Sequence, residues 1–159
     1  MDTQTWLPIV TLLLGGAVGL GGERWREARS TTRERETRRK DFQRNAILEA
    51  QGLLAKHIQL GSAKLSDAGR RHKETGNWPE EGQIDPDNAS SRIETSIKLV
   101  AVGSRIEDED LRVSLGITVD RMLWVGVEGA EQSEAFFRAA IEAQKSFHGR
   151  AREVLAELH

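Results

Sequence analysis

An uncharged apolar segment, residues 6–22, followed at once by a charged segment, residues 23–40, constrains the fold more than any other feature of the sequence. The apolar segment reads WLPIVTLLLGGAVGLGG. A segment that spans lipid must pair its own backbone polar groups, so it is expected to be helical. Trp6 and Trp25 would lie about 28 Å apart along this helix, close to the hydrocarbon thickness of about 30 Å. We therefore predict a transmembrane helix over residues 6–22, with the two indoles at the lipid–water interfaces.

Three other interpretations of this segment fit the sequence less well. A secretory signal peptide has a positive n-region, whereas only Asp2 carries charge before the apolar core. The run Gly19-Leu20-Gly21-Gly22 resembles a phosphate-binding loop, but it lacks the third glycine of GxGxxG and no βαβ pattern follows. The third interpretation, a buried helix of a soluble protein, conflicts with the charges that flank the segment.

The charged segment predicts the orientation of the chain in the membrane. Residues 23–40 hold eight basic side chains and four glutamates, and the N-terminal side of the anchor holds no basic side chain. Because Lys and Arg are retained on the cytoplasmic side, we expect residues 1–5 outside and the C-terminal domain inside the cell. Residues 23–41 then form a basic neck, which is either a helical stalk or a partly disordered linker. Anionic lipid head groups would attract it by about 1 kcal/mol per basic residue.

The anchor also carries small residues at the spacing that favours helix association in lipid. Gly15 and Gly19 form a GxxxG motif, and Ala17 and Gly21 repeat the small-xxx-small pattern beside it. Small residues four apart let two helix backbones approach closely, which predicts self-association of the anchor. The alternative is that glycine is simply common in membrane helices.

Residues 42–159 are enough for one modest domain, and their periodicity indicates an all-α fold. A wide apolar stripe begins at residue 42, and it predicts packing against more than one neighbour, as in a bundle. Its members are Phe42, Ala46, Ile47, Ala50, Leu53, Leu54, His57, Ile58, Leu60, Leu65 and Ala68. The prediction is therefore an N-terminal transmembrane helix, a charged helical neck and an antiparallel bundle of about four helices.

The other elements of the bundle follow from local signals. Residues 75–90 hold two prolines, two glycines and several acidic side chains, which predicts a loop. Ser91 and Glu94 fit a capping box that opens the next helix, with Ile93, Ile97, Val100 and Ala101 along one side of it. The last helix has the clearest stripe, formed by Phe136, Phe137, Ala140, Ile141, Ala143, Phe147, Ala151, Val154, Leu155 and Leu158.

Residues 106–127 fit both a helix and a strand. Leu111, Leu115, Met122 and Leu123 suit one helix face, and Val113, Ile117 and Trp124 suit another, as expected of a central helix. Val113, Leu115, Ile117 and Val119 also alternate with the period of a strand. The helical context on both sides favours a helix.

Few residues suggest chemistry. His57 lies in the apolar stripe, where a core histidine is the more common interpretation and a ligand or pH-sensitive group the alternative. No metal-ligand spacing relates it to His72, His148 or His159. Asp108, Glu109 and Asp110 suit the positive end of a helix dipole, and the spacing is not that of a calcium loop. Trp78 is either a docking residue or folds back on the bundle. We predict no catalytic residue, no cofactor and no metal site.

Charge and composition narrow the partners. Residues 23–74 carry 14 basic and 8 acidic side chains, and residues 75–159 carry 9 basic and 16 acidic. The basic neck is therefore expected to bind anionic lipid. Nucleic acid is not an expected partner, because Trp25 is the only aromatic residue of the neck and no base-reading motif is present. The chain has no cysteine, which fits a reducing cytoplasm.

Two stretches carry a resemblance to known proteins. GGERWRE ends the apolar segment, and the second stretch is Val102-Gly103-Ser104-Arg105-Ile106-Glu107-Asp108-Glu109-Asp110-Leu111-Arg112, in which Arg105–Arg112 is the local motif. With the Arg/Glu-rich neck and the helix-rich remainder, the chain resembles small single-pass membrane proteins of high-GC actinobacteria. The resemblance implies membrane placement and helix content, and it implies no activity.

The sequence therefore predicts a membrane-anchored, non-enzymatic interaction or scaffold protein. No Ser/His/Asp constellation, HExxH, P-loop or paired-cysteine site is visible. One alternative is a membrane-tethered ligand sensor that uses a bundle cavity near His57. Another is a small membrane-perturbing protein, similar to a phage lysis accessory protein, in which the anchor itself acts.

Overall fold

The computed structural model describes residues 7–79 and 86–158, with side chains over 32–79 and 87–158. The described residues are all-helical and include no strand. In chain order the helices are α1 (Leu7–Thr75), α2 (Pro86–Gly103), α3 (Glu109–Trp124) and α4 (Ala130–Glu157). The chain divides into two compact units, Met1–Asp41 and Phe42–His159.

The first unit contains the beginning of α1, in which the backbone of the basic neck is helical. Side chains of residues 32–41 are exposed, and Glu34 lies 3.7 Å from Arg38, one helical turn away. Such an exposed pair contributes only tenths of a kcal/mol. The predicted anchor over residues 6–22 lies outside the residues whose side chains are described, as do Gly15, Ala17, Gly19 and Gly21. Within the described residues, no helix is both long and apolar enough to cross a bilayer.

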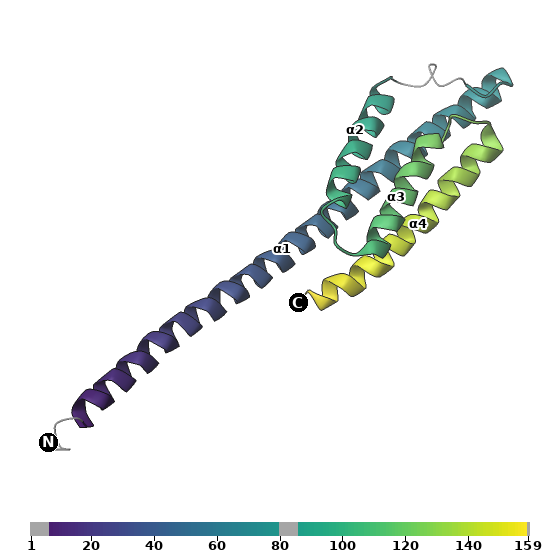
Figure 1. Cartoon of the computed structure of the whole chain (residues 1–159). Coiled ribbons are helices and arrows are strands. Elements are labelled where there is room, and N and C mark those ends of the chain that lie inside the picture. The colour runs from purple at the N-terminus through teal and green to yellow at the C-terminus, as the bar shows by residue number, and fades with distance from the viewer. Residues whose placement is uncertain (1–6, 80–85, 159) are drawn as a thin grey trace. The chain divides into compact units, whose positions relative to one another are not determined.

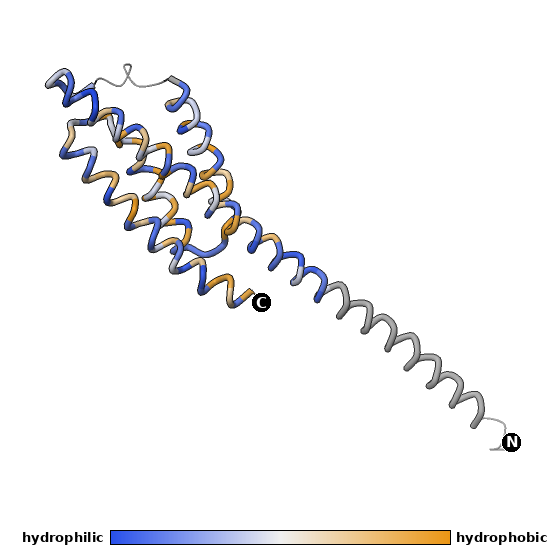
Figure 2. Tube along the Cα trace, turned by 180° about the vertical axis from the view of Figure 1, so that it is seen from behind, coloured by the Kyte–Doolittle hydropathy of each residue, from blue (hydrophilic) through white to orange (hydrophobic). Residues whose placement is uncertain are grey.

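The second unit is a bundle in which successive helices run in opposite directions (Figure 1). Its four members are the C-terminal part of α1, from Phe42 to Thr75, followed by α2, α3 and α4. Hydrophobic and hydrophilic residues alternate along its helices (Figure 2), as amphipathic helices require. α3 packs along α4 and also contacts α2. The fold class predicted for residues 42–159 is confirmed.

The larger part of the core joins all four helices. Phe147 of α4 and Leu54 of α1 are completely buried, and complete burial of such side chains contributes about 1.5–3 kcal/mol each. The cluster consists of Ala46, Ile47, Ala50, Leu54, Leu99, Val102, Ile106, Leu111, Leu115, Val119, Phe147 and Ala151. Among the predicted stripe residues of α1, Phe42 differs, because half of its surface is exposed.

A second, smaller cluster joins α3 and α4 near the turn that connects them. Met122, Val125 and Ala140 are buried there, and Ile58, Leu65, Phe136 and Phe137 pack against them. Gly126, with a φ of +78°, follows in the turn, and its N–H donates to the buried Ser133 hydroxyl at 3.0 Å. A positive φ is open to glycine at little cost, so Gly126 permits the sharp change of direction into α4.

α2 begins earlier than predicted. Its first residue is Pro86, so Ser91 and Glu94 lie inside the helix and the capping-box prediction is wrong. Glu94 pairs instead with Lys98 one turn later, and the Ser91 carbonyl accepts the Thr95 hydroxyl at 2.7 Å. Proline suits a first helical position because its fixed φ is helical and its missing N–H would have no partner there. The predicted loop of residues 75–90 is correspondingly shorter.

The ambiguous stretch, residues 106–127, is helical over Glu109–Trp124, which confirms the helix and excludes the strand. Asp108 is the N-cap of α3, and its Oδ1 accepts the N–H of Leu111 at 3.0 Å. An aspartate at this position satisfies one of the helix's unpaired N–H groups and favours the positive end of the dipole.

The connection between α2 and α3 is held by the side chain of one α1 residue. Gln43, almost fully buried, donates to the Arg105 carbonyl at 2.8 Å and accepts the Glu107 N–H at 2.9 Å. Arg105 also pairs with Glu49 at 2.7 Å, and Ile106 is buried in the core. The stretch over residues 102–112 therefore contains a structural connection fixed to α1.

Candidate functional site

α2 presents a row of branched aliphatic side chains to the outside of the bundle. Ile93, Ile97 and Val100 follow one another at intervals of four and three residues, and they are 57–65% exposed. The opposite side of the helix supplies Leu99 and Val102 to the core. The residues predicted to share one side of this helix do so, and that side is the exposed one.

α3 also has a second apolar strip that the bundle leaves uncovered. Val113, Ile117 and Trp124 are 44–50% exposed, although the sequence predicted a central helix with both faces packed. That prediction is wrong in the single chain, because α3 has neighbours only on the side that carries Leu111, Leu115, Thr118, Val119 and Met122.

A groove lies between α2 and α3 and reaches the α2 row at Val100. It encloses about 370 Å³, and its lining includes the exposed apolar side chains of Val100 and Leu123. Gly116, which is exposed, also lines the groove, as do Arg112 and Asp120, four residues to either side of it. We call the outer surface formed by the exposed apolar residues of α2 and α3 and by this groove the α2–α3 face. Its exposed apolar members are Ile93, Ile97, Val100, Val113, Ile117, Leu123 and Trp124.

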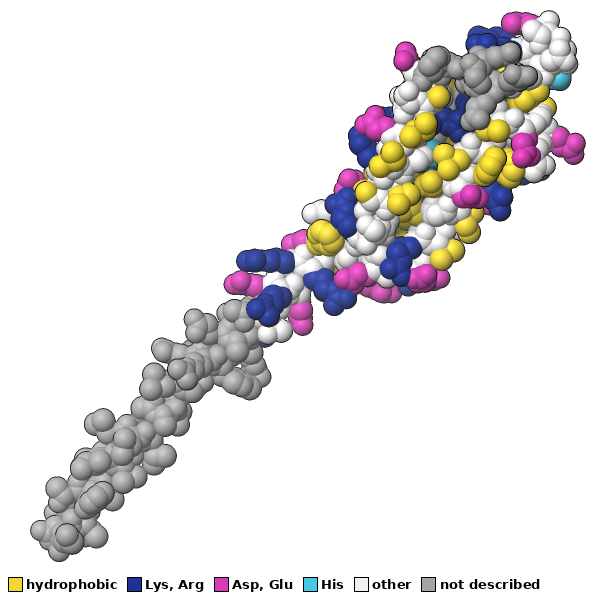
Figure 3. Space-filling view, turned by 45° about the horizontal axis from the view of Figure 1, so that its top comes forward, with side chains coloured by type: hydrophobic (Ala, Val, Ile, Leu, Met, Phe, Trp, Pro, Cys, Tyr) yellow, Lys and Arg dark blue, Asp and Glu magenta, His cyan; other side chains and the backbone are white. Residues whose placement is uncertain are grey.

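Hydrophobic side chains spread over one outer side of the bundle while charged side chains gather toward its borders (Figure 3). Nine large hydrophobic residues of the described part of the chain are exposed, and seven of them belong to α2 and α3. Single exposed apolar residues are normal, whereas a contiguous patch with a polar rim marks an interaction surface. The α2–α3 face corresponds to such an interaction surface.

His57 is completely buried in α1, as a core histidine would be. Neither ring nitrogen has a hydrogen-bond partner of normal geometry. Burial lowers the pKa of His57 to about 4 because a charged ring is poorly solvated there. The positive charge of Arg92 acts in the same direction, and the backbone of Val119 opposes both more weakly. The imidazole is therefore neutral at pH 7, and it lines neither the groove nor the pocket described below.

Two further basic residues lie inside the same part of the bundle. Arg92 of α2 donates to the carbonyls of Met122 and Leu123, at the C-terminal end of α3. A guanidinium at this position satisfies carbonyls that have no partner within the helix and favours the negative end of its dipole. The stem of Lys64 packs on Gly126, where an added Cβ would lie 2.8 Å from the lysine Cε. Arg92 therefore contacts the end of α3, and Lys64 contacts the connection between α3 and α4.

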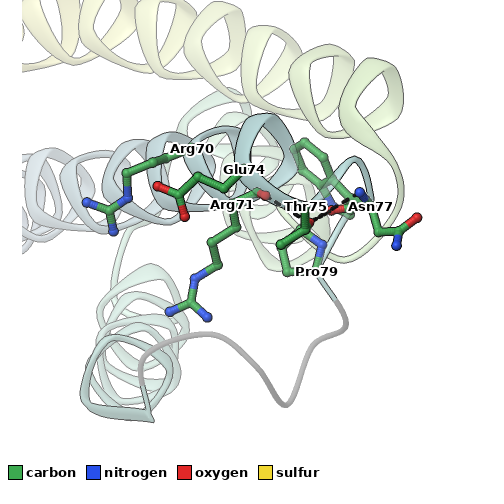
Figure 4. A pocket seen from close by; sticks show the side chains of 7 residues that line it. Arg70, Arg71, Glu74, Thr75, Asn77 and Pro79 are labelled. Carbon is green, nitrogen blue, oxygen red and sulfur yellow. Dashed lines mark hydrogen bonds between the residues drawn. The ribbon is translucent and has the colours of Figure 1, made fainter.

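The pocket at the end of α1 is more polar than the groove. It encloses about 730 Å³, and Arg70, Arg71, Glu74, Thr75, Asn77, Trp78 and Pro79 line it (Figure 4). Thr75 closes the turn here, since its hydroxyl donates to the Arg71 carbonyl at 2.9 Å. Trp78 is half-buried, with its ring 5.9 Å from that of His72, so it folds back onto α1.

The acidic run at the start of α3 is engaged by an arginine. Arg150 of α4 donates to Asp108 through Nη2 at 2.7 Å and through Nε at 3.1 Å. The Arg150 guanidinium holds the pKa of the Asp108 carboxyl below its usual range. Glu109 pairs with Arg112, and Asp110 lies 3.9 Å from Arg150. Within the described ranges, no group of three His, Asp or Glu side chains is arranged to hold a metal ion.

No family model, curated protein or solved structure matches the chain. The candidate site is thus defined by the exposed apolar surface alone. Two of its features were readable from the sequence, namely the row Ile93, Ile97 and Val100 and the second strip of α3. Their exposure was not, because periodicity identifies a helix face without identifying what covers it.

Proposed function

We propose that this chain is a membrane-anchored, non-enzymatic interaction protein that binds a protein partner through the α2–α3 face. The observation that supports this function is the set of seven exposed apolar side chains on α2 and α3, with a groove of about 370 Å³ between the two helices. Such a surface costs solvation free energy in the isolated chain, and burial against a partner recovers about 25 cal/mol per Å² of apolar area.

The membrane placement rests on the sequence. Seventeen uncharged residues, 6–22, precede eight basic side chains, so the proposal places residues 1–5 outside and the bundle in the cytoplasm. The neck then lies against anionic head groups. Self-association through Gly15 and Gly19 is a further element of this proposal. The ligand-sensor alternative has less support, since His57 is fully buried and lines neither described pocket.

Photo-crosslinking tests the interaction function. A photoreactive amino acid replaces Ile97 on the α2–α3 face in the full-length chain, and the same amino acid replaces Ala139, an exposed residue of α4, as the control. Irradiation in intact cells should give discrete protein adducts from position 97 that position 139 does not give. Absence of adducts at position 97, or the same adducts at both positions, would contradict the proposal.

Fractionation tests the anchor separately. The full-length chain should sediment with membranes and resist extraction by alkaline carbonate, whereas a variant without residues 1–22 should be released. Because the chain has no cysteine, Thr3→Cys and Ser30→Cys report the two sides of the membrane without interference. Thr3→Cys should react with an impermeant maleimide in intact cells and Ser30→Cys only after permeabilisation. The reverse pattern would overturn the orientation, and recovery of the full-length chain in the cytosol would overturn the anchor.

A further inference from the structure

We propose that the partner on the α2–α3 face is a second copy of this chain, bound about a two-fold axis that passes close to Gly116. This inference rests on the proposed function and names its partner. In a two-fold interface the same surface serves both copies, so the surface must be complementary to itself. The face meets this condition in its apolar character and its charge.

The charges are arranged for an antiparallel pairing of α3 with its own copy. Arg112 and Asp120 lie four residues before and after Gly116, about 6 Å to either side along the helix. Rotation by a half-turn about Gly116 therefore sets Arg112 of each copy opposite Asp120 of the other. A parallel pairing would bring like charges together. Within one copy Arg112 pairs with Glu109 and Asp120 lies 3.8 Å from Arg121, so both side chains remain at the surface.

Gly116 suits a helix crossing point. It is exposed in the middle of α3, and an added Cβ there would meet no atom within 4 Å. Glycine inside a helix costs about 0.5–1 kcal/mol relative to alanine, while the missing side chain lets another backbone approach closely. The exposed strip of Val113, Ile117 and Trp124 runs beside this point and supplies the apolar area.

The pairing also explains the second apolar strip of α3. The sequence predicted a central helix, and in the single chain the strip faces outward. A second copy against it would make α3 central in a two-fold assembly of two bundles. The apolar strip would then supply most of the affinity, and the two Arg–Asp pairs would fix the antiparallel register, as charges at interfaces usually do.

Disulfide trapping tests the position of the axis. A residue on a two-fold axis lies next to its own copy, so Gly116→Cys should cross-link to a covalent dimer when the two Cα atoms lie about 4.4–6.8 Å apart. Gly149→Cys is the matched control, since Gly149 is also an exposed helical glycine with open space around it. Both are made in the full-length chain with Gly15→Ile and Gly19→Ile, so that the predicted anchor does not contribute. Cross-linking of Gly116→Cys no faster than that of Gly149→Cys would overturn the proposal.

A charge exchange tests the register. Arg112→Asp and Asp120→Arg should each weaken dimerisation about tenfold, because each places like charges opposite one another twice. The double variant restores opposite charges and should return to within about threefold of the parent. Circular dichroism shows whether each variant folds, and analytical ultracentrifugation in detergent measures association. Failure of the double variant to recover, with the fold intact, would contradict the antiparallel pairing.

The outcomes separate this inference from the proposed function. Adducts of position 97 with a different protein, together with no disulfide trapping at position 116, would contradict the second copy as partner. The proposed function as an interaction protein would still stand. No adduct of any kind at position 97 would contradict both the proposed function and the second copy as partner. Trapping at Gly116 together with self-adducts at Ile97 supports both.

Discussion

Arg150 of α4 donates two hydrogen bonds to one carboxylate oxygen of Asp108, the residue that caps α3. The other oxygen of Asp108 accepts the N–H of Leu111. One carboxylate therefore both begins α3 and ties it to the last helix. This arrangement gives Asp108, which belongs to the acidic run at the start of α3, a structural role.

Replacement of Asp108 should separate the two roles. Asp108→Ala loses the cap and the ion pair, and we expect a loss of about 2 kcal/mol in the free energy of unfolding. Asp108→Asn keeps an oxygen that can accept the Leu111 N–H, so it should lose about half as much. Denaturant unfolding followed by circular dichroism measures both values. Equal losses in the two variants would show that the cap contributes nothing.

Gln43 should control the connection between α2 and α3. Gln43→Leu removes a donor to Arg105 and an acceptor for Glu107, and we expect a loss of about 1–3 kcal/mol because buried backbone groups lose their partners. Gln43→Glu keeps the acceptor and is the matched control. Amide hydrogen exchange should show faster exchange of the Glu107 N–H in Gln43→Leu than in Gln43→Glu. An unchanged rate in Gln43→Leu would contradict this role.

Two glycines of α1 should respond to alanine in opposite directions. Gly52 is exposed with no atom within 4 Å of an added Cβ, so Gly52→Ala should stabilise the chain by about 0.5–1 kcal/mol. At Gly61 an added Cβ would lie 1.8 Å from the Cε of buried Met122, and Gly61→Ala should destabilise by about 1–3 kcal/mol.

A double-mutant cycle checks the cause at Gly61. If the methionine side chain is the obstacle, the loss from Gly61→Ala should shrink when Met122→Val has already removed the clashing atoms. Thermal unfolding measures all four variants. Strictly additive losses would place the obstacle elsewhere.

Stability should fall with acid in a window set by His57. Its pKa is lowered from 6.5 to about 4, so the unfolded chain binds a proton in this range that the folded chain does not bind. The contribution of His57 to the free energy of unfolding is fully present above pH 6.5. It falls by about 3 kcal/mol as the pH is lowered to 4. The carboxyl of Asp108, whose pKa is lowered, loses its contribution only at lower pH, as it is protonated.

His57→Leu should flatten the stability profile between pH 6.5 and pH 4. At pH 7 the variant should be as stable as the parent or slightly more so, because it removes two buried nitrogens that lack partners. His72→Leu, at an exposed position of α1, is the control. A slope in His57→Leu equal to that of the parent would assign the acid sensitivity to other groups.

The local patterns were reliable where one element determines the outcome. The stripe from Ala46 to Ala68 and the stripe centred on Phe147 both face the core, because spacing in an amphipathic helix fixes which residues share a face. The start of α2 was predicted wrongly because residues 75–90 are rich in turn-forming residues. Pro86 is one of them, and proline is common both in turns and at the first position of a helix.

The buried polar contacts could not be read from the chain. Gln43 and Glu107, which are hydrogen-bonded, lie 64 residues apart in the sequence, and Asp108 and Arg150 lie 42 residues apart. No local spacing relates such residues. In the sequence, Arg92 likewise cannot be told from a surface arginine. Its role follows from the end of α3, where the carbonyls of Met122 and Leu123 accept its hydrogen bonds.

By itself the sequence determined that residues 42–159 form amphipathic helices, because helical periodicity is a property of each segment alone. It also supplied the uncharged segment and basic neck from which membrane placement is proposed. Only the tertiary structure decided which side of α2 and of α3 is buried, since both helices carry apolar residues on more than one side. Hydrophobic burial has no preferred direction, so the choice belongs to the neighbouring helices, and it leaves Ile97 and Ile117 facing outward.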